Sequence, residues 1–151
     1  MFTMVRRFIK TALAFLASGL LLGAYLLTKR ELQGAFPHPY LVSAHVHAVG
    51  VGFLMFLILG VALWLFPKPP KDDNRYQPQR IAFAYWLLLG ATGSRFIAEM
   101  ARASIDTVWL RTVILVSGFG QIVGLMVYFY TMWTRIRPVG SHLREAKGER
   151  F

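Results

Sequence analysis

Long apolar runs alternate with short polar segments along this chain. A helix needs about 20 apolar residues to cross the hydrocarbon of a bilayer. Four runs meet that length and predict helices over approximately residues 9–27, 39–66, 80–101 and 107–133. Pro39 suits the first turn of a helix, where its missing N–H is not needed. The pattern predicts an all-α fold, a four-helix transmembrane bundle forming one membrane domain over 1–151, with a polar cytoplasmic tail at 134–151.

The first apolar run follows a short basic start, which is also how a cleaved signal peptide begins. The run shows no clear cleavage site of the small-x-small type. It carries Gly19 and Gly23, four residues apart, a spacing typical of closely packed membrane helices. We therefore expect a retained first transmembrane helix.

The composition agrees with a membrane protein. The chain is 56% hydrophobic and 16% charged, with a mean hydropathy of +0.47, whereas soluble domains are about 25% charged. It has no cysteine, which excludes disulfides, thiolate metal sites and covalent c-type haem attachment. The net charge of +10 does not predict a nucleic-acid partner, because the basic residues gather at the ends of apolar runs. Topology and the anionic headgroups of the lipid bilayer explain it more simply.

The basic residues also predict orientation, because cytoplasmic segments are rich in lysine and arginine. Three basic residues fall in the first and third loops: Lys29, Arg30 and Arg102. Twelve fall in the N-terminal segment, the second loop and the tail: Arg6, Arg7, Lys10, Lys68, Lys71, Arg75, Arg80, Arg135, Arg137, Arg144, Lys147 and Arg150. We expect both termini in the cytoplasm (N-in/C-in).

Two histidines, His45 and His47, stand near the non-cytoplasmic end of the second run. A helix turns about 100° per residue, so two side chains two residues apart point about 200° apart. Ionisable side chains in a membrane span are costly and indicate function by default, although a hydrogen-bonded packing histidine is the alternative. Neutral imidazole is a frequent ligand of haem iron. A zinc or copper site within one protomer is not favoured, because the two rings diverge and no cysteine assists.

The segment YLVSAHVHAVGVGFLMFLILGVALWLFP, residues 40–67, resembles the haem-ligating helices of subunit I of the haem-copper oxidase and nitric oxide reductase superfamily. RYQPQRIAFAYWLLLGATG, residues 75–93, is similar to the loop and helix that follow there. The resemblance covers about 40–99. It implies that His45 and His47 each face a separate haem. It also implies that this chain is similar to one of the three four-helix arcs of subunit I, and it leads us to expect the cytoplasmic (inner) membrane of a prokaryote.

These implications lead to a hypothesis about assembly. His47 of one protomer and His45 of its neighbour ligate one haem b between them, and a cyclic trimer rebuilds the three-arc layout. A dimer with His47 paired to His47 across a twofold axis is the alternative. Arg95 and Arg111 lie at a similar depth and are the expected partners of the haem propionates. The alternative for Arg95 is an ion pair with Glu99, four residues further along.

The chain departs from the family in its remaining metal ligands. No helix carries the His-His pair or the cross-linked His-Tyr pair that binds copper there, so a copper-containing oxygen-reducing centre is not predicted. Electron transfer through a histidine-ligated haem is the favoured function, with a quinone or a cytochrome as redox partner. Binding or reduction of nitric oxide or oxygen at a five-coordinate haem, as a haem-dependent oxidoreductase, is one alternative. A non-catalytic accessory or assembly subunit of a respiratory complex is the other.

Overall fold

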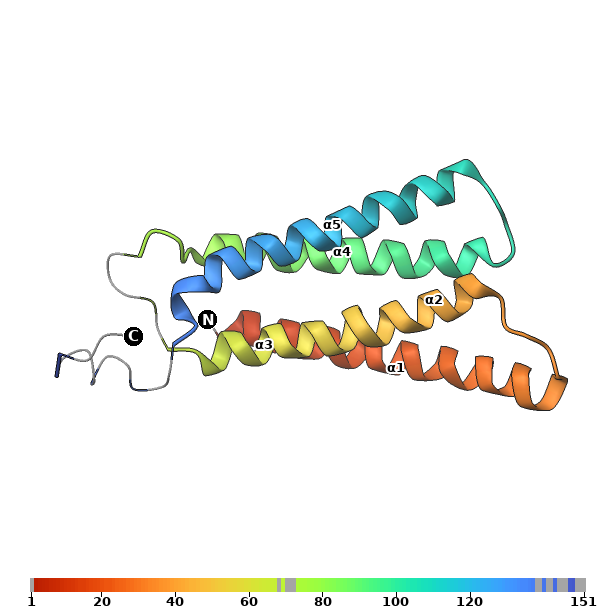
Figure 1. Cartoon of the computed structure of the whole chain (residues 1–151), viewed down its shortest axis with the longest axis horizontal. Coiled ribbons are helices and arrows are strands. Elements are labelled where there is room, and N and C mark those ends of the chain that lie inside the picture. The colour runs from red at the N-terminus through yellow and green to blue at the C-terminus, as the bar shows by residue number, and fades with distance from the viewer. Residues whose placement is uncertain are drawn as a thin grey trace.

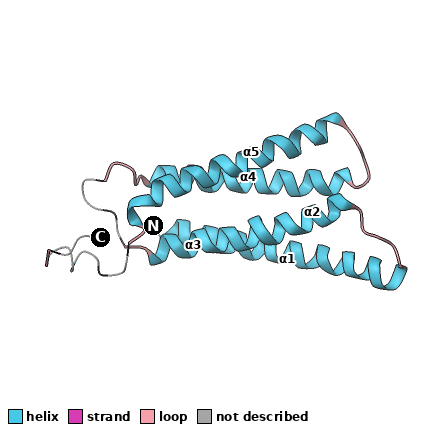
Figure 2. Cartoon of the chain, viewed as in Figure 1, coloured by secondary structure: helices cyan, strands magenta, loops and turns pink. Residues whose placement is uncertain are grey.

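A computed structural model describes residues 2–67, 69, 73–137, 140, 143 and 147–148. Four helices in this part of the chain are long and apolar enough to cross a membrane, at Thr3–Gln33, Pro39–Leu65, Pro78–Arg102 and Val108–Arg135. The predicted all-α bundle of four spans is therefore present, and no strand occurs among the described residues. Figure 2 shows helix along all four spans and loops at the two ends of the bundle. The predicted tail is described at 134–137, 140, 143 and 147–148, and the rest of it lies outside the described residues.

The first helix, α1, runs from Phe2 to Gln33 and is longer than the predicted 9–27. Arginine, lysine, glutamate and leucine flank its apolar run, and all of them favour helix. Hydropathy marks the part of a helix that lies in hydrocarbon and not the length of the helix. Gly34 ends α1 with a φ of +60°, and the Ala35 N–H donates back to the Lys29 carbonyl, in keeping with glycine's ease in the left-handed region.

The second span is divided into three helical segments. The α-helices α2 (Pro39–His47) and α3 (Phe56–Leu65) flank a π-helical segment, η1 (Ala48–Met55). The predicted uninterrupted helix over 39–66 thus has a change of helix type directly after His47. Short π segments inside α-helices are rare and occur often at functional sites. At the start of α2, His38 Nδ1 accepts from the Tyr40 N–H at 3.3 Å, which caps the helix.

The third and fourth spans are close to their predicted limits. Helix α4 runs over Pro78–Arg102 and α5 over Val108–Met132, followed by a 3₁₀ turn, η2, over Trp133–Arg135. Thr107 caps α5 by accepting from the Leu110 N–H at 3.4 Å. The chain therefore forms two antiparallel helix pairs that lie side by side, α1 with the second span and α4 with α5 (Figure 1). The start of α1 and η2 lie at the same end of the bundle (Figure 1), as four spans require.

Four aromatic rings fill the centre of the bundle at that end. The Phe8 ring of α1 lies with its centroid 5.7 Å from Phe56, 5.0 Å from Tyr85 and 5.9 Å from Tyr128. The Tyr85 hydroxyl is 2.8 Å from the Thr11 hydroxyl, and all four rings are buried. We call this end the aromatic half, defined by Phe8, Phe56, Tyr85 and Tyr128. One residue of α1 thus joins all the other spans.

Arg135 closes the aromatic half from η2. Its Nε donates to the Pro67 carbonyl at 2.9 Å, and its Nη2 donates to the Leu63 and Phe66 carbonyls at 3.1 and 2.8 Å. Leu63 lies in the last turn of α3, where carbonyls have no partners within the helix, and Phe66 and Pro67 follow the helix directly. The guanidinium also lies 4.8 Å from the centroid of the Tyr76 ring. Arg135 therefore ties the end of α5 to the end of α3.

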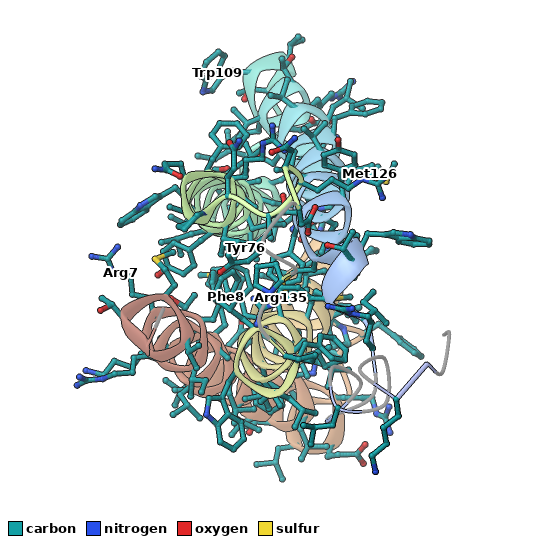
Figure 3. All side chains as sticks on the ribbon, turned by 90° about the vertical axis from the view of Figure 1, so that its left-hand side faces the viewer. Arg7, Phe8, Tyr76, Trp109, Met126 and Arg135 are labelled. Atoms are coloured by element: carbon teal, nitrogen blue, oxygen red, sulfur yellow. The ribbon has the colours of Figure 1, made fainter. Side chains whose placement is uncertain are left out.

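Figure 3 looks along the bundle from this end. Phe8, Tyr76 and Arg135 lie near its middle, between the two helix pairs (Figure 3). Trp109 and Met126 project outward from α5 (Figure 3), and both are exposed. Exposed apolar side chains on a membrane span contact lipid or another protein, so exposure here is consistent with the membrane environment.

Candidate functional site

The two histidines contact different neighbouring helices. His45 Nδ1 lies 2.9 Å from the Gly19 carbonyl of α1. His47 Nδ1 lies 2.9 Å from the Ser43 carbonyl and 3.1 Å from Oε2 of Glu99 on α4. The prediction that the two rings lie on opposite faces of one helix is confirmed by these contacts. Two rings held by α1 and by α4 cannot converge on one iron within a single protomer.

The hydrogen bonds assign the protons on both rings. A carbonyl oxygen can only accept, so each Nδ1 carries hydrogen and donates, to Gly19 from His45 and to Ser43 from His47. In a neutral imidazole the other nitrogen, Nε2, then carries a lone pair. Neither Nε2 has a hydrogen-bond partner among the described residues. An Nδ1–H fixed by an oxygen, with Nε2 free, is the arrangement of a metal-ligating histidine.

Glu99 is the centre of the polar contacts around His47. Its side chain is 1% exposed, and its Oε1 accepts from the Ser43 hydroxyl at 2.9 Å and from Arg95 Nε at 3.1 Å. Arg95 Nη1 donates onward to Gln121 on α5 at 3.1 Å. A buried carboxylate is stable only when charge and hydrogen bonds compensate it, and here a guanidinium, a hydroxyl and an imidazole do so. We call this end the histidine half, defined by Ser43, His45, His47, Arg95 and Glu99.

His47 lines a groove between η1, α4 and α5. The groove has a volume of about 510 Å³, and its other lining residues include Val51, Arg95, Gly118 and Leu125. Its walls are mainly apolar, with His47, Arg95 and Gln121 as polar groups. Volumes of about 300–1,000 Å³ with few polar groups are typical of small-molecule sites. Helix α5 has its close backbone contacts with α4, and it reaches the second span through Tyr128, whose hydroxyl donates to the Leu59 carbonyl in the aromatic half.

His45 lines a second groove, on the other side of α2. This groove has a volume of about 420 Å³ and is lined by Gly23, Arg30, Phe36 and Pro37 among others. A Cβ at Gly23 would lie 2.8 Å from His45 Cε1, so the ring occupies space that only a glycine leaves. Each histidine therefore faces a separate groove, and each groove also holds one arginine.

The expected propionate partners have different positions. Arg95 lies beside His47 in the first groove, and it also forms the ion pair with Glu99 that was the alternative. Arg111 lines neither histidine groove and instead binds Asp106 through two hydrogen bonds of 3.0 and 2.6 Å. Hydrogen bonding from Arg111 holds the pKa of the Asp106 carboxyl below its ordinary value. Depth along the sequence placed both arginines at one level but could not say which face each occupies.

Three residues that contact the histidines or line their grooves were not predicted as site residues. Glu99 accepts from His47, Ser43 presents both its carbonyl and its hydroxyl to this pair, and Arg30 lines the His45 groove. Ser43 had a usable signal, because it precedes His47 by one helical turn. Arg30 had none, because it lies at the end of a helix predicted to stop at residue 27.

No three His, Cys, Asp or Glu side chains in the described ranges come together as a possible metal site. Axial ligation of a haem needs only one or two residues, so single histidines with free Nε2 atoms fit that group. Searches against protein-family models, curated proteins and solved structures find no match to this chain.

Proposed function

We propose that this chain is an integral membrane haem b protein that transfers electrons through haem held between protomers. The main support is that His45 and His47 each have Nδ1 hydrogen-bonded to a backbone carbonyl and an Nε2 without a hydrogen-bond partner among the described residues. The two rings also lie in separate grooves. Bound haem b supplies a one-electron iron couple. In this proposal the histidines hold the iron, and Arg95 and Arg30 bind the propionates, which guanidinium groups recognise well.

The divergence of the two rings supports a shared site. Because His45 packs on α1 and His47 on α4, a haem with two histidine ligands must take one from each of two protomers. Pairing His47 of one protomer with His45 of the next is a heterologous contact, which forms a ring when its rotation closes on the first protomer. We favour a trimer, the arrangement that the resemblance to haem-copper oxidase subunit I suggests. We place it N-in/C-in in a prokaryotic inner membrane with a quinone or cytochrome as redox partner.

Spectra of the purified protein test the cofactor. We expect a Soret band, one haem b per chain, and a reduced spectrum that carbon monoxide does not change, since both axial positions are filled. H45A and H47A should each lose a ligand and become reactive with carbon monoxide. H38N is the matched control, because asparagine keeps the cap of α2 and His38 lies outside both histidine grooves. Absence of haem from the wild type, or full ligation in both alanine variants, would falsify the proposal.

Co-expression of H45A and H47A chains distinguishes the trimer from the dimer. In a ring, an interface between an H45A chain and an H47A chain can still bring an intact His47 to an intact His45. We therefore expect the mixture to recover part of the carbon-monoxide-insensitive haem that neither variant has alone. In the His47-to-His47 dimer, H45A alone is already normal and mixing recovers nothing beyond it. A carbon-monoxide-reactive wild type would instead support the five-coordinate, gas-binding alternative.

A further inference from the structure

The two histidines have chemically different hydrogen-bond acceptors. His45 Nδ1 donates to one neutral carbonyl, that of Gly19, at 2.9 Å. His47 Nδ1 lies near three oxygens, Ser43 O at 2.9 Å, Glu99 Oε2 at 3.1 Å and the Ser43 hydroxyl at 3.3 Å, of which Glu99 supplies the carboxylate. Hydrogen bonds to an ionised group are about twice as strong as those between neutral groups. The two axial ligands that the proposed haem would take are therefore unequal.

The Glu99 carboxylate is held in place by burial and by several hydrogen bonds. It is 1% exposed, and besides His47 it accepts from the Ser43 hydroxyl and from Arg95 Nε. Two of its contacts come from α2 and one from its own helix, so the carboxylate is fixed against the ring by both elements. Because the surroundings exclude water, its interaction with the imidazole is screened less than on a protein surface.

We infer that Glu99 is a positioning residue that lowers the redox potential of iron bound at His47. This inference rests on the proposed function. A carboxylate that accepts from Nδ1–H fixes the tautomer and makes Nε2 a stronger electron donor to a metal. Stronger donation stabilises the ferric more than the ferrous state, since the ferric iron carries one more positive charge. Glu99 acts only through His47 and does not itself contact the iron.

Redox titration of the haem-loaded protein at one pH tests the inference. We expect E99Q to shift the midpoint potential to more positive values by about 59 mV, the one-electron equivalent of a tenfold change in the equilibrium, a size in line with other partners of metal-bound histidines. E99D keeps a carboxylate and should give a smaller shift. D106N is the matched control, because it also replaces a carboxylate by an amide but at a residue that lines neither histidine groove, and its potential should stay near the wild-type value.

Loss of a negative charge alone would also raise the potential, so a charge-balanced variant is needed. R95Q/E99Q removes one charge of each sign and leaves the local net charge unchanged, while it also removes the carboxylate from His47. A positive shift that persists in R95Q/E99Q supports the inference, and a return to the wild-type potential overturns it. If E99Q alone retains no haem, the double variant, loaded with excess haem, carries the test. Haem in the wild type with no shift in any Glu99 variant refutes only the role of Glu99, whereas a wild type without haem refutes the proposed function.

Discussion

The two halves of the bundle solve the problem of joining four helices in different ways. In the aromatic half, Phe8 contacts rings from the second span, α4 and α5, and Arg135 ties α5 to α3. In the histidine half, α1 packs on α2, and α2 packs on α4. Ser43 and His47 also hydrogen-bond to Glu99 of α4, and Arg95 of α4 donates to Gln121 of α5. Grooves of about 510 and 420 Å³ open beside the two histidines. The first half is closed by its own side chains, and the second is left partly open.

Under the proposed function, this difference places the stabilising core and the haem ligands in separate halves of the bundle. Helices in a bilayer gain little from burial, because lipid is as apolar as leucine, and are held by close packing and hydrogen bonds. The aromatic half holds most of the buried apolar core within one chain. The histidine half can therefore keep two imidazoles and a buried carboxylate, which contribute little net stability for their cost. Variants in the two halves should accordingly have separable effects.

Truncation of Phe8 should give the largest loss of stability. Its side chain is fully buried among three other rings, and F8A would leave a cavity that the rigid neighbouring rings fill poorly. We expect a loss of about 3 kcal/mol in the free energy of unfolding, at the low end of the range for such truncations, because lipid solvates apolar groups in the unfolded state too. Equilibrium unfolding in mixed detergent micelles measures it.

L20A is the control for F8A. Leu20 lies on the same helix and is 59% exposed, so its truncation should cost far less than that of Phe8. Equal losses in the two variants would mean that the aromatic half is not the stabilising part of the bundle. Haem content per folded chain should be the same in both variants, because neither side chain touches a histidine groove.

The sequence was sufficient for the spans and for the divergence of the histidines, because both follow from properties of one helix at a time. Apolar length determines a span, and the helical turn separates His45 from His47. The sequence was insufficient where the position of a side chain depends on which residues of other helices or loops it contacts. Arg111 pairs with Asp106 of the preceding loop and not with a groove, and Glu99 meets His47 across 52 positions. The π segment η1 could not be predicted either, because the apolar run from Pro39 to Phe66 shows no change of periodicity where η1 begins.

Two glycine-to-alanine changes should have separate effects, one on the stability of the bundle and the other on haem ligation by His45. A Cβ at Gly60 would lie 2.8 Å from Phe8 Cβ, next to the backbone of α1. G60A must therefore move a helix, which should lower the free energy of unfolding by about 1–3 kcal/mol.

A Cβ at Gly23 would lie 2.8 Å from His45 Cε1, the end of a side chain that can rotate. G23A should turn the His45 ring away, reproduce the carbon monoxide reactivity of H45A, and leave the free energy of unfolding within about 1 kcal/mol of wild type, because alanine also favours helix.

G90A is the matched control for both changes, since no heavy atom lies within 4 Å of a Cβ built there. It should neither destabilise the protein nor alter its haem spectrum. If G23A destabilised the protein as much as G60A with the haem unchanged, the packing of His45 against Gly23 would be structural and the histidine half would differ from the aromatic half only in composition.

The smallest expected effect lies in the loop that closes the histidine half. Asp106 accepts from Arg111 and lies 3.1 Å from Arg102, and the hydrogen bond from Arg111 keeps its pKa below the ordinary value. A carboxyl whose pKa is lowered by folding stabilises the protein above its unfolded pKa of about 3.9, and that contribution disappears as the pH falls through the folded pKa. Wild type should therefore melt slightly above D106N at pH 7, and the difference should shrink to nothing as the pH falls below 3.9. Because the group is exposed, added salt should reduce the difference at pH 7 as well. A difference that persisted in acid would mean that Asp106 acts through the backbone of the loop and not through its charge.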